Sequence, residues 1–229
     1  MKQRQDPEKS TERKKKILIV DDHAVVREGL TTVINQHPDL TVCGQVDSGA
    51  KAMAAVASLK PDAVIVDISL EGRSGLDLIK DLKAQHPHLP TLALSMHDET
   101  LYAERALRAG AHGYVMKKES TKDMVAALRR VLDGSFHVSD RMAGRIMQQF
   151  AKQERVTARS PVELLSDREL EVFQFIGQGV GTRQIAEKLH LSIKTVSCYR
   201  QNIKTKLNLK TSTELVTHAI HWAASNPTG

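Results

Sequence analysis

Three aspartates, a serine and a lysine each stand at the end of a short apolar run, and together they could carry phosphoryl chemistry. The five are Asp21, Asp22, Asp67, Ser95 and Lys117. Carboxylates that converge on one site repel one another and favour a hard cation with oxygen ligands, hence Mg²⁺. A carboxylate beside that ion can attack phosphorus and form an acyl phosphate, and Asp67 is the candidate nucleophile. Lys117 can pair with a phosphoryl oxygen, and the Ser95 hydroxyl can donate a hydrogen bond to another.

These side chains meet only if the apolar runs are strands of one parallel sheet. Runs at 17–20, 40–46, 63–66, 91–95 and 113–116 alternate with helical patterns at 24–34, 49–59, 76–86, 101–109 and 120–132. Five strand–helix units in alternation predict an α/β fold with a doubly wound, five-stranded parallel sheet. Right-handed crossovers place the C-terminal end of every strand at one edge, where ligands bind in such sheets. The five polar residues would then share that edge.

The composition limits the class of protein and its location. Hydrophobic residues at 41% and charged residues at 26% are typical of a water-soluble globular protein. No apolar run reaches the roughly 18 residues that a membrane span needs. The first residues are charged rather than apolar, and the two cysteines match no metal-binding spacing. We therefore expect a cytoplasmic protein with no membrane partner.

The C-terminal part of the chain has a helical pattern only. Helices are predicted at 166–176, 182–189, 192–207 and 211–222. Two short helices joined by a tight turn at His190 predict a helix-turn-helix. Between residues 183 and 210, seven basic side chains are opposed by one acidic side chain, Glu187. Such a basic patch is the expected footprint of a nucleic-acid phosphate backbone.

The helix around 193–207 would read DNA with the face opposite its buried residues. With about 100° per residue and Val196 at the centre of the buried face, a set of five side chains points outward. These are Lys194, Ser197, Cys198, Gln201 and Thr205. Gln201 is the best candidate base reader because its amide can pair bidentately with adenine. Phosphate contacts are expected from Arg200, Lys204, Lys188 and Arg183.

Two sets of motifs give the chain a family resemblance. The strand that ends at Asp67, with VDDH at 20–23, LALSMHD at 92–98 and GYVMKK at 113–118, looks like the receiver domain of bacterial two-component response regulators. The segments LSDRELEVFQFIGQG and TRQIAEKLHLSIKTVSCYRQNIKTKL look like the LuxR-type helix-turn-helix. Over residues 16–225 the chain therefore resembles the NarL/FixJ class of transcription factors.

The resemblance implies a transcription factor that a partner histidine kinase switches by phosphorylating Asp67. It implies Asp21, Asp22 and Asp67 as Mg²⁺ ligands, Ser95 and Lys117 as the phosphate-sensing pair, and Tyr114 as a coupled aromatic that moves from exposed to buried. It also implies a homodimer on promoter DNA, with RNA polymerase as a further candidate partner. Enzymatic activity would be limited to slow self-phosphorylation from small donors and self-dephosphorylation. Without phosphorylation, the receiver would cover the DNA-reading helix.

This interpretation divides the chain into four parts: a disordered basic tail (1–15), a receiver domain with a flavodoxin-like fold (16–135), a linker with one helix (136–161) and a LuxR-type DNA-binding domain (162–229). The last helix, with Val216, Ile220 and Trp222, is the candidate dimer surface. Leu70–Glu71 stand where the family usually has Met-Pro, and Met96 stands where a small residue is common. Met96 and the non-acidic Ser69 predict a long-lived phosphoryl group.

Other functions remain open from the residues alone. A Mg²⁺-dependent phosphatase or phosphotransferase could use Asp67 as an aspartyl-phosphate intermediate, although such enzymes usually carry a second acid near the nucleophile. A DNA-binding protein could carry an unphosphorylated receiver, and the basic helices could belong to a protein-binding bundle. A dinucleotide-dependent enzyme is disfavoured because no GxGxxG motif follows the first strand.

Overall fold

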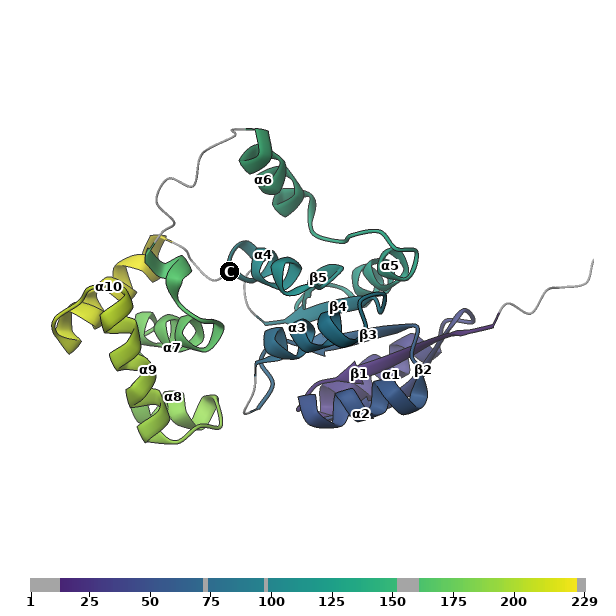
Figure 1. Cartoon of the computed structure of the whole chain (residues 1–229), viewed down its shortest axis with the longest axis horizontal. Coiled ribbons are helices and arrows are strands. Elements are labelled where there is room, and N and C mark those ends of the chain that lie inside the picture. The colour runs from purple at the N-terminus through teal and green to yellow at the C-terminus, as the bar shows by residue number, and fades with distance from the viewer. Residues whose placement is uncertain (1–12, 72–73, 97–98, 152–160, 226–229) are drawn as a thin grey trace, which may run out of the picture.

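The computed structural model describes residues 13–71, 74–96, 99–151 and 161–225. The first part forms a sheet of β1 (Lys15–Val20), β2 (Leu40–Val46), β3 (Ala63–Asp67), β4 (Thr91–Ser95) and β5 (Gly113–Met116). The strand order is β2-β1-β3-β4-β5, and all neighbouring strands are parallel. The predicted five-stranded parallel sheet is therefore confirmed (Figure 1).

Helices cover both faces of this sheet, as a doubly wound fold requires. They are α1 (Ala24–Asn35), α2 (Gly49–Leu59), α3 (Gly75–Gln85), α4 (Glu99–Ala109) and α5 (Thr121–Leu132). In β1, Leu18 and Val20 belong to the core that includes α2, α3 and α4, while Ile17 and Ile19 belong to the core that includes α1 and α5. This alternation follows from the two-residue period of a strand. The sheet and α1–α5 are called the N-terminal domain below.

Several element boundaries differ from the predicted ones, most clearly the starts of β1 and α4 and the end of α10 at Ser225 rather than 222. β1 begins at Lys15, whose N–H donates to the carbonyl of Asp39 at 2.9 Å, so this lysine is not part of a disordered tail. Residues 1–12 of that predicted tail lie outside the described residues. Helix α4 begins at Glu99 rather than at 101. Backbone hydrogen bonds extend each element past its apolar residues. Hydropathy alone does not reveal this extension.

The segment after α5 returns to the edge strand β5. The N–H of Tyr114 donates to the carbonyl of His137 at 2.9 Å, and the N–H of His137 donates to the carbonyl of His112 at 2.9 Å. Phe136 stacks on the ring of His112 with a centroid distance of 5.7 Å. Helix α6 (Asp140–Ala151) follows, where the sequence predicts the linker helix. The first residues of the predicted linker are therefore hydrogen-bonded to the edge of the sheet.

The C-terminal domain is entirely helical in its described residues, 161–225, as predicted. It contains a short 3₁₀ helix, η1 (Pro161–Leu164), which the sequence did not predict, and α7 (Asp167–Gly177), α8 (Thr182–Lys188), α9 (Ile193–Lys206) and α10 (Ser212–Ser225). Ser166 and Glu169 form the predicted capping box at the start of α7, and Ser192 caps α9. Residues 152–160, expected to be flexible, lie outside the described residues.

Candidate functional site

The C-terminal edge of the sheet brings two aspartates and a lysine into contact. Asp67 is the last residue of β3, Asp21 follows β1, and Lys117 follows β5. The Nζ of Lys117 lies 2.7 Å from Oδ2 of Asp21 and 2.8 Å from Oδ2 of Asp67. Both aspartates are only 1% exposed. Three side chains that are far apart in the sequence thus form one buried ionic group, as the order of the strand ends predicts.

Asp22 and His23 complete the acidic group. One ligand atom from each of Asp21, Asp22, His23 and Asp67 can be chosen so that all four lie within 4.8 Å of one another. The Nδ1 of His23 lies 2.6 Å from Oδ1 of Asp22. Carboxylate oxygens are the ligands that a hard divalent cation prefers, and three carboxylates lie together at the C-terminal edge of the sheet. The donor set therefore fits Mg²⁺. His23 was not among the predicted site residues, although a histidine directly after two aspartates is a visible signal.

The charges of this group shape its acid–base behaviour. Burial raises the pKa of the Asp67 carboxyl; the nearby Lys117 opposes that rise, and Asp21 adds to it. Burial alone would lower the pKa of Lys117, but the carboxylates of Asp67 and Asp21 raise it above its usual value. The lysine therefore stays charged and compensates two buried acids.

Ser95 lies on β4, the strand next to that of Asp67, and Tyr114 lies on β5, one strand further along the sheet. Ser95 ends β4 and is fully buried, and its carbonyl accepts a 2.7 Å hydrogen bond from the N–H of Lys117. Tyr114 lies in β5 and is 3% exposed. The sequence predicts an aromatic that moves from exposed to buried, and this structure already holds Tyr114 in the buried state.

A short loop after Asp67 is tied to the acidic group through its backbone. The N–H of Ser69 donates to Oδ1 of Asp67 at 3.2 Å, and the N–H of Glu71 donates to Oδ2 of Asp22 at 2.9 Å. Between them, the side chain of Leu70 is 1% exposed. Met96 is 71% exposed. These three residues are called the 69–71 loop below.

Gly75, at the start of α3, leaves no room for a side chain beside Asp67. A Cβ at this position would lie 1.9 Å from the carbonyl oxygen of Asp67. Gly75→Ala must therefore move the start of α3 or the end of β3, and we expect it to lower the free energy of unfolding by about 1–3 kcal/mol. Gly29→Ala in α1 is the control, because a Cβ there meets nothing within 4 Å. Urea unfolding of both variants measures the difference; equal midpoints would contradict the prediction.

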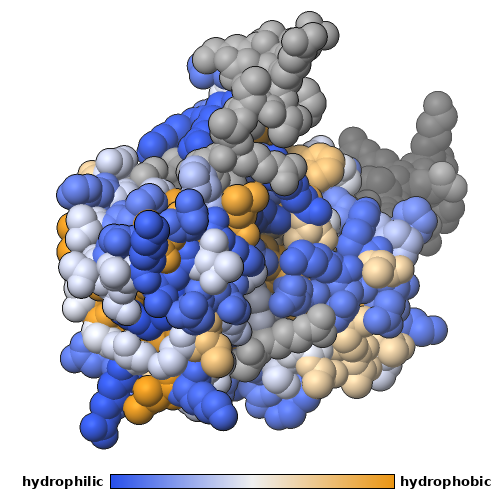
Figure 2. Space-filling view, turned by 60° about the vertical axis from the view of Figure 1, so that its left-hand side comes forward, coloured by the Kyte–Doolittle hydropathy of each residue, from blue (hydrophilic) through white to orange (hydrophobic). Residues whose placement is uncertain are grey.

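The residues predicted to read DNA lie on the open side of α9. Lys194, Ser197, Cys198, Gln201 and Thr205 are all exposed, and Val196 is buried. Of the four predicted phosphate contacts, Lys188 and Arg183 are exposed, and Arg200 and Lys204 are half-buried. Figure 2 brings the C-terminal domain forward and shows a largely hydrophilic surface with small, scattered hydrophobic groups. The helical geometry of the prediction therefore agrees with the observed burial.

The two domains meet through α7 rather than α9. Arg105 of α4 donates to the carbonyl of Leu165 at 2.8 Å and to Oδ1 of Asp167 at 3.0 Å. Tyr102 of α4 donates to Oε1 of Gln174 at 3.2 Å. Figure 1 shows α7 beside α3 and α4, with α9 on its outer side. The expectation that the N-terminal domain covers the DNA-reading helix is therefore wrong for this structure.

The sequence did not reveal which polar residues form this contact. Arg168 and Glu171 are 8% and 0% exposed, and Gln174 is 5% exposed. On α7 these residues alternate with apolar ones and suggest a solvated helix face. They are covered by the N-terminal domain, through residues such as Leu70 and Tyr102 that are distant in sequence. No local sequence pattern therefore indicates their burial.

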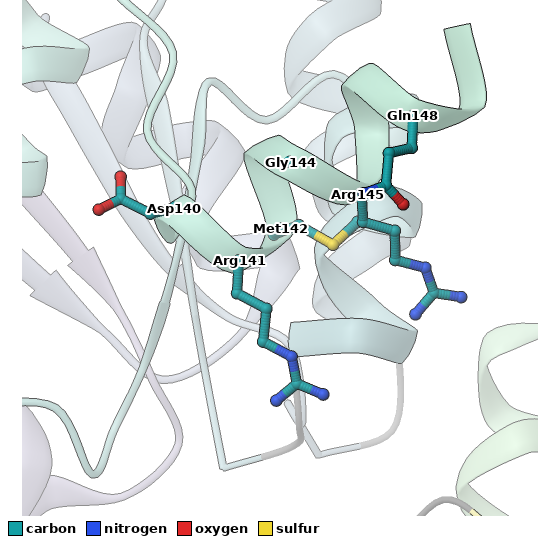
Figure 3. Close-up of a pocket in the computed structure, with 6 residues that line it drawn as sticks. All are labelled: Asp140, Arg141, Met142, Gly144, Arg145 and Gln148. Atoms are coloured by element: carbon teal, nitrogen blue, oxygen red, sulfur yellow. The ribbon is translucent and has the colours of Figure 1, made fainter. Parts of the chain in front are cut away.

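A separate pocket of about 380 Å³ lies along α6. Its lining consists of Asp140, Arg141, Met142, Gly144, Arg145 and Gln148. Figure 3 shows Arg141 and Arg145 extending from successive turns of the helix. None of the predicted site residues lines it. In the described parts of the chain, every helix is too short or too polar to cross a membrane.

Comparison with known protein families gives one match in each of the two domains. Residues 17–129 match the response regulator receiver domain, and residues 163–219 match the LuxR family of bacterial regulatory proteins. The oxygen regulatory protein NreC of Staphylococcus epidermidis is 36% identical over 210 residues, which cover 90% of this chain and 96% of NreC. NreC of Staphylococcus haemolyticus is 36% identical over 209 residues, with the same coverage.

Solved structures show the same architecture. A LuxR-family two-component response regulator from Aurantimonas sp. SI85-9A1 is 28% identical, with a TM-score of 0.56 over 61% of this chain and 99% of that one. RcsB from Salmonella enterica serovar Typhimurium, solved on a promoter, is 23% identical, with a TM-score of 0.58 over 90% of this chain and 98% of RcsB. The likeness to RcsB supports the fold.

Proposed function

Because this chain belongs to the response regulators that join a receiver domain to a LuxR-type DNA-binding domain, we propose that phosphorylation of Asp67 switches its binding to promoter DNA. The observation that carries the proposal is the contact of Lys117 with both Asp67 and Asp21 at one sheet edge. A partner histidine kinase is the expected phosphoryl source, since the receiver domain implies one.

In the proposed reaction, a carboxylate oxygen of Asp67 attacks the phosphorus of a phosphohistidine. The new O–P bond forms as the P–N bond breaks, and the electron pair of that bond stays on the histidine nitrogen. Lys117 is placed to pair with a phosphoryl oxygen as charge builds there. Ser95, at the end of the adjacent strand, is the proposed hydrogen-bond donor to a second oxygen.

Asp21, Asp22 and Asp67 are the proposed ligands of Mg²⁺. When bound, the ion neutralises negative charge on the transferred group. Asp21 and Asp67 are buried and their positions are fixed by Lys117, whereas Asp22 is partly exposed at the mouth of the site. Slow phosphorylation by small donors and slow self-dephosphorylation follow from the same groups acting without a kinase.

The DNA-reading face of α9 is proposed to enter the major groove as part of a homodimer. The five exposed side chains and the four basic residues described above support the proposal that this face binds DNA. Val216, Ile220 and Trp222 on α10 remain the proposed dimer surface, with Ile220 45% exposed. A homodimer would present two copies of α9 to paired half-sites. RNA polymerase remains a candidate partner, and a cytoplasmic location fits a DNA-binding regulator.

DNA binding by the full chain tests the switch. Purified protein is titrated onto genomic promoter fragments with and without acetyl phosphate and Mg²⁺. We expect tighter binding only in the sample that contains the phosphodonor. Equal binding in both samples would leave a DNA-binding protein without the proposed switch. No binding to any fragment would favour the phosphotransferase or protein-partner alternatives.

Gln201 is expected to contribute sequence specificity. Loss of a bidentate amide–adenine pair typically costs about 1–3 kcal/mol, so Gln201→Ala should weaken binding to the specific site by roughly 10- to 100-fold. Binding to unrelated DNA should change little, because phosphate contacts remain. Asn202→Ala on the same helix is the control, since Asn202 is exposed but lies off the predicted face. The affinities for the specific site are compared by competition binding at fixed salt. An equal loss of affinity in Gln201→Ala and Asn202→Ala would contradict the prediction.

A further inference from the structure

We propose that Arg168, a residue of the DNA-binding domain, positions the 69–71 loop of the receiver, so that docking of α7 and phosphorylation of Asp67 oppose each other. This inference rests on the proposed function of Asp67 and adds the contact through which the two domains communicate. Reciprocity is required by thermodynamics: if phosphorylation weakens docking, undocking must favour phosphorylation by the same factor.

The position of Arg168 carries the argument. Its guanidinium donates to the carbonyl oxygen of Leu70, the middle residue of the 69–71 loop. The two neighbours of Leu70 are the residues whose N–H groups bind Asp67 and Asp22. A loop of three residues is therefore held by the acidic group at both ends and by the other domain at its centre. Movement of the loop is therefore coupled to the position of α7 through this hydrogen bond.

The same guanidinium holds a buried carboxylate. The Nη1 of Arg168 lies 2.6 Å from Oε2 of Glu171, which is fully buried. The planar guanidinium offers separate N–H groups to this carboxylate and to the Leu70 carbonyl. A lysine ammonium is a poorer substitute for such a fork. Buried ion pairs depend on complete partnering, because an uncompensated buried charge is strongly unfavourable.

Beside the apolar residues of the shared core, further polar contacts between the domains come from Arg105 and Lys80. Arg105 binds the start of α7, as described above, and its Nη2 lies 3.4 Å from the carbonyl of Val162. The Nζ of Lys80 in α3 lies 3.5 Å from Oδ2 of Asp167. Interfaces of this kind between domains resemble transient protein–protein contacts. Docking can therefore respond to a modest change in charge.

Phosphorylation supplies that change. Burial raises the pKa of Glu171 to about 7; Arg168 opposes the rise, and the negative charges of Asp167 and Asp67 add to it. The negative charge of Asp67 thus already disfavours the ionised form of Glu171. A phosphoryl group carries a charge of about −1.5 to −2, more than the carboxylate that it modifies. The added charge makes the buried Glu171 carboxylate less favourable and weakens docking.

Phosphorylation rates of the full chain test the inference. We compare Arg168→Gln and Arg105→Ala with wild type and with Arg108→Ala, an exposed arginine of α4 that pairs with Glu104 outside the interface. The measurements are the initial rate of phosphoryl incorporation from acetyl phosphate with Mg²⁺, and amide hydrogen exchange at 162–174 before the donor is added. Arg105→Ala leaves the core of α7 intact, so the test stands even if Arg168→Gln does not fold.

We expect both interface variants to be phosphorylated at least about five-fold faster than wild type, because undocking raises the fraction of molecules whose 69–71 loop can move. Five-fold is the low end of typical coupling between sites. Exchange at 162–174 should already be raised, and Arg108→Ala should match wild type. A rate for Arg105→Ala equal to that of Arg108→Ala would overturn the inference while leaving Asp67 as phosphoacceptor. Absence of incorporation into wild type would overturn the proposed function, and this inference with it.

Discussion

Asp67→Asn should abolish phosphoryl incorporation from both a cognate kinase and acetyl phosphate. Asparagine keeps the shape of the side chain, but its amide is not a nucleophile towards phosphorus. The variant should remain folded, because burial raises the pKa of Asp67 and the fold therefore disfavours its ionised form. Lys117 also keeps its 2.7 Å contact with Asp21. Intact-mass measurement before and after treatment with the donor reports the transferred group directly.

Asp47→Asn is the matched control for this experiment. Asp47 follows β2, so it lies at the same edge of the sheet, but it pairs with Lys51 at 2.7 Å outside the acidic group. This variant should incorporate one phosphoryl group as wild type does. Incorporation into Asp67→Asn at the rate of the control would show that another residue is the phosphoacceptor.

Phe173→Ala should unfold the DNA-binding domain under conditions where wild type is stable. Phe173 is fully buried in α7, and its ring packs against Trp222 and His218 of α10 with centroid distances of 5.5 and 5.9 Å. Truncating a buried phenylalanine typically costs about 3–5 kcal/mol. A domain of this size usually has only a few kcal/mol of stability to lose. Specific DNA binding should be lost with the fold.

Trp222 is the single tryptophan of the chain, so its fluorescence follows unfolding of this domain in urea. Phe175→Ala is the control, because Phe175 lies on the same helix but is only half-buried, with the Nζ of Lys188 5.9 Å from its ring centre. We expect a much smaller shift of the midpoint for this variant. Equal midpoints for the two would mean that Phe173 is not central to the packing of α7 on α10.

Much of the acidic site could be predicted because one structural rule governs it. Asp67, Asp21 and Lys117 each follow an apolar strand, and parallel strands deliver their C-terminal ends to one edge. Hydropathy alone therefore predicts that they meet. Likewise, the buried position of Val196 and the exposed position of Gln201 follow from helical periodicity.

The interface between the domains could not be predicted in this way. Arg168 and Glu171 are charged, and charged residues on a helix normally face water. Arg168 donates to the carbonyl of Leu70 and pairs with Glu171, so the burial of both depends on the receiver domain that packs against α7. Tyr114 is a similar case, since its burial depends on packing between strands and helices and not on its neighbours in sequence. Local patterns describe elements, whereas these contacts arise from how two finished domains fit together.

The segment that returns to β5 also bears on the solubility of the protein. An open strand edge exposes unpaired N–H and C=O groups that can recruit a strand from another molecule. Here the N–H of Tyr114 donates to the carbonyl of His137, and the N–H of His137 donates to the carbonyl of His112. One of the two sheet edges is thus partly closed by the chain itself. The start of the linker therefore protects concentrated protein against edge-to-edge aggregation, in addition to joining the domains.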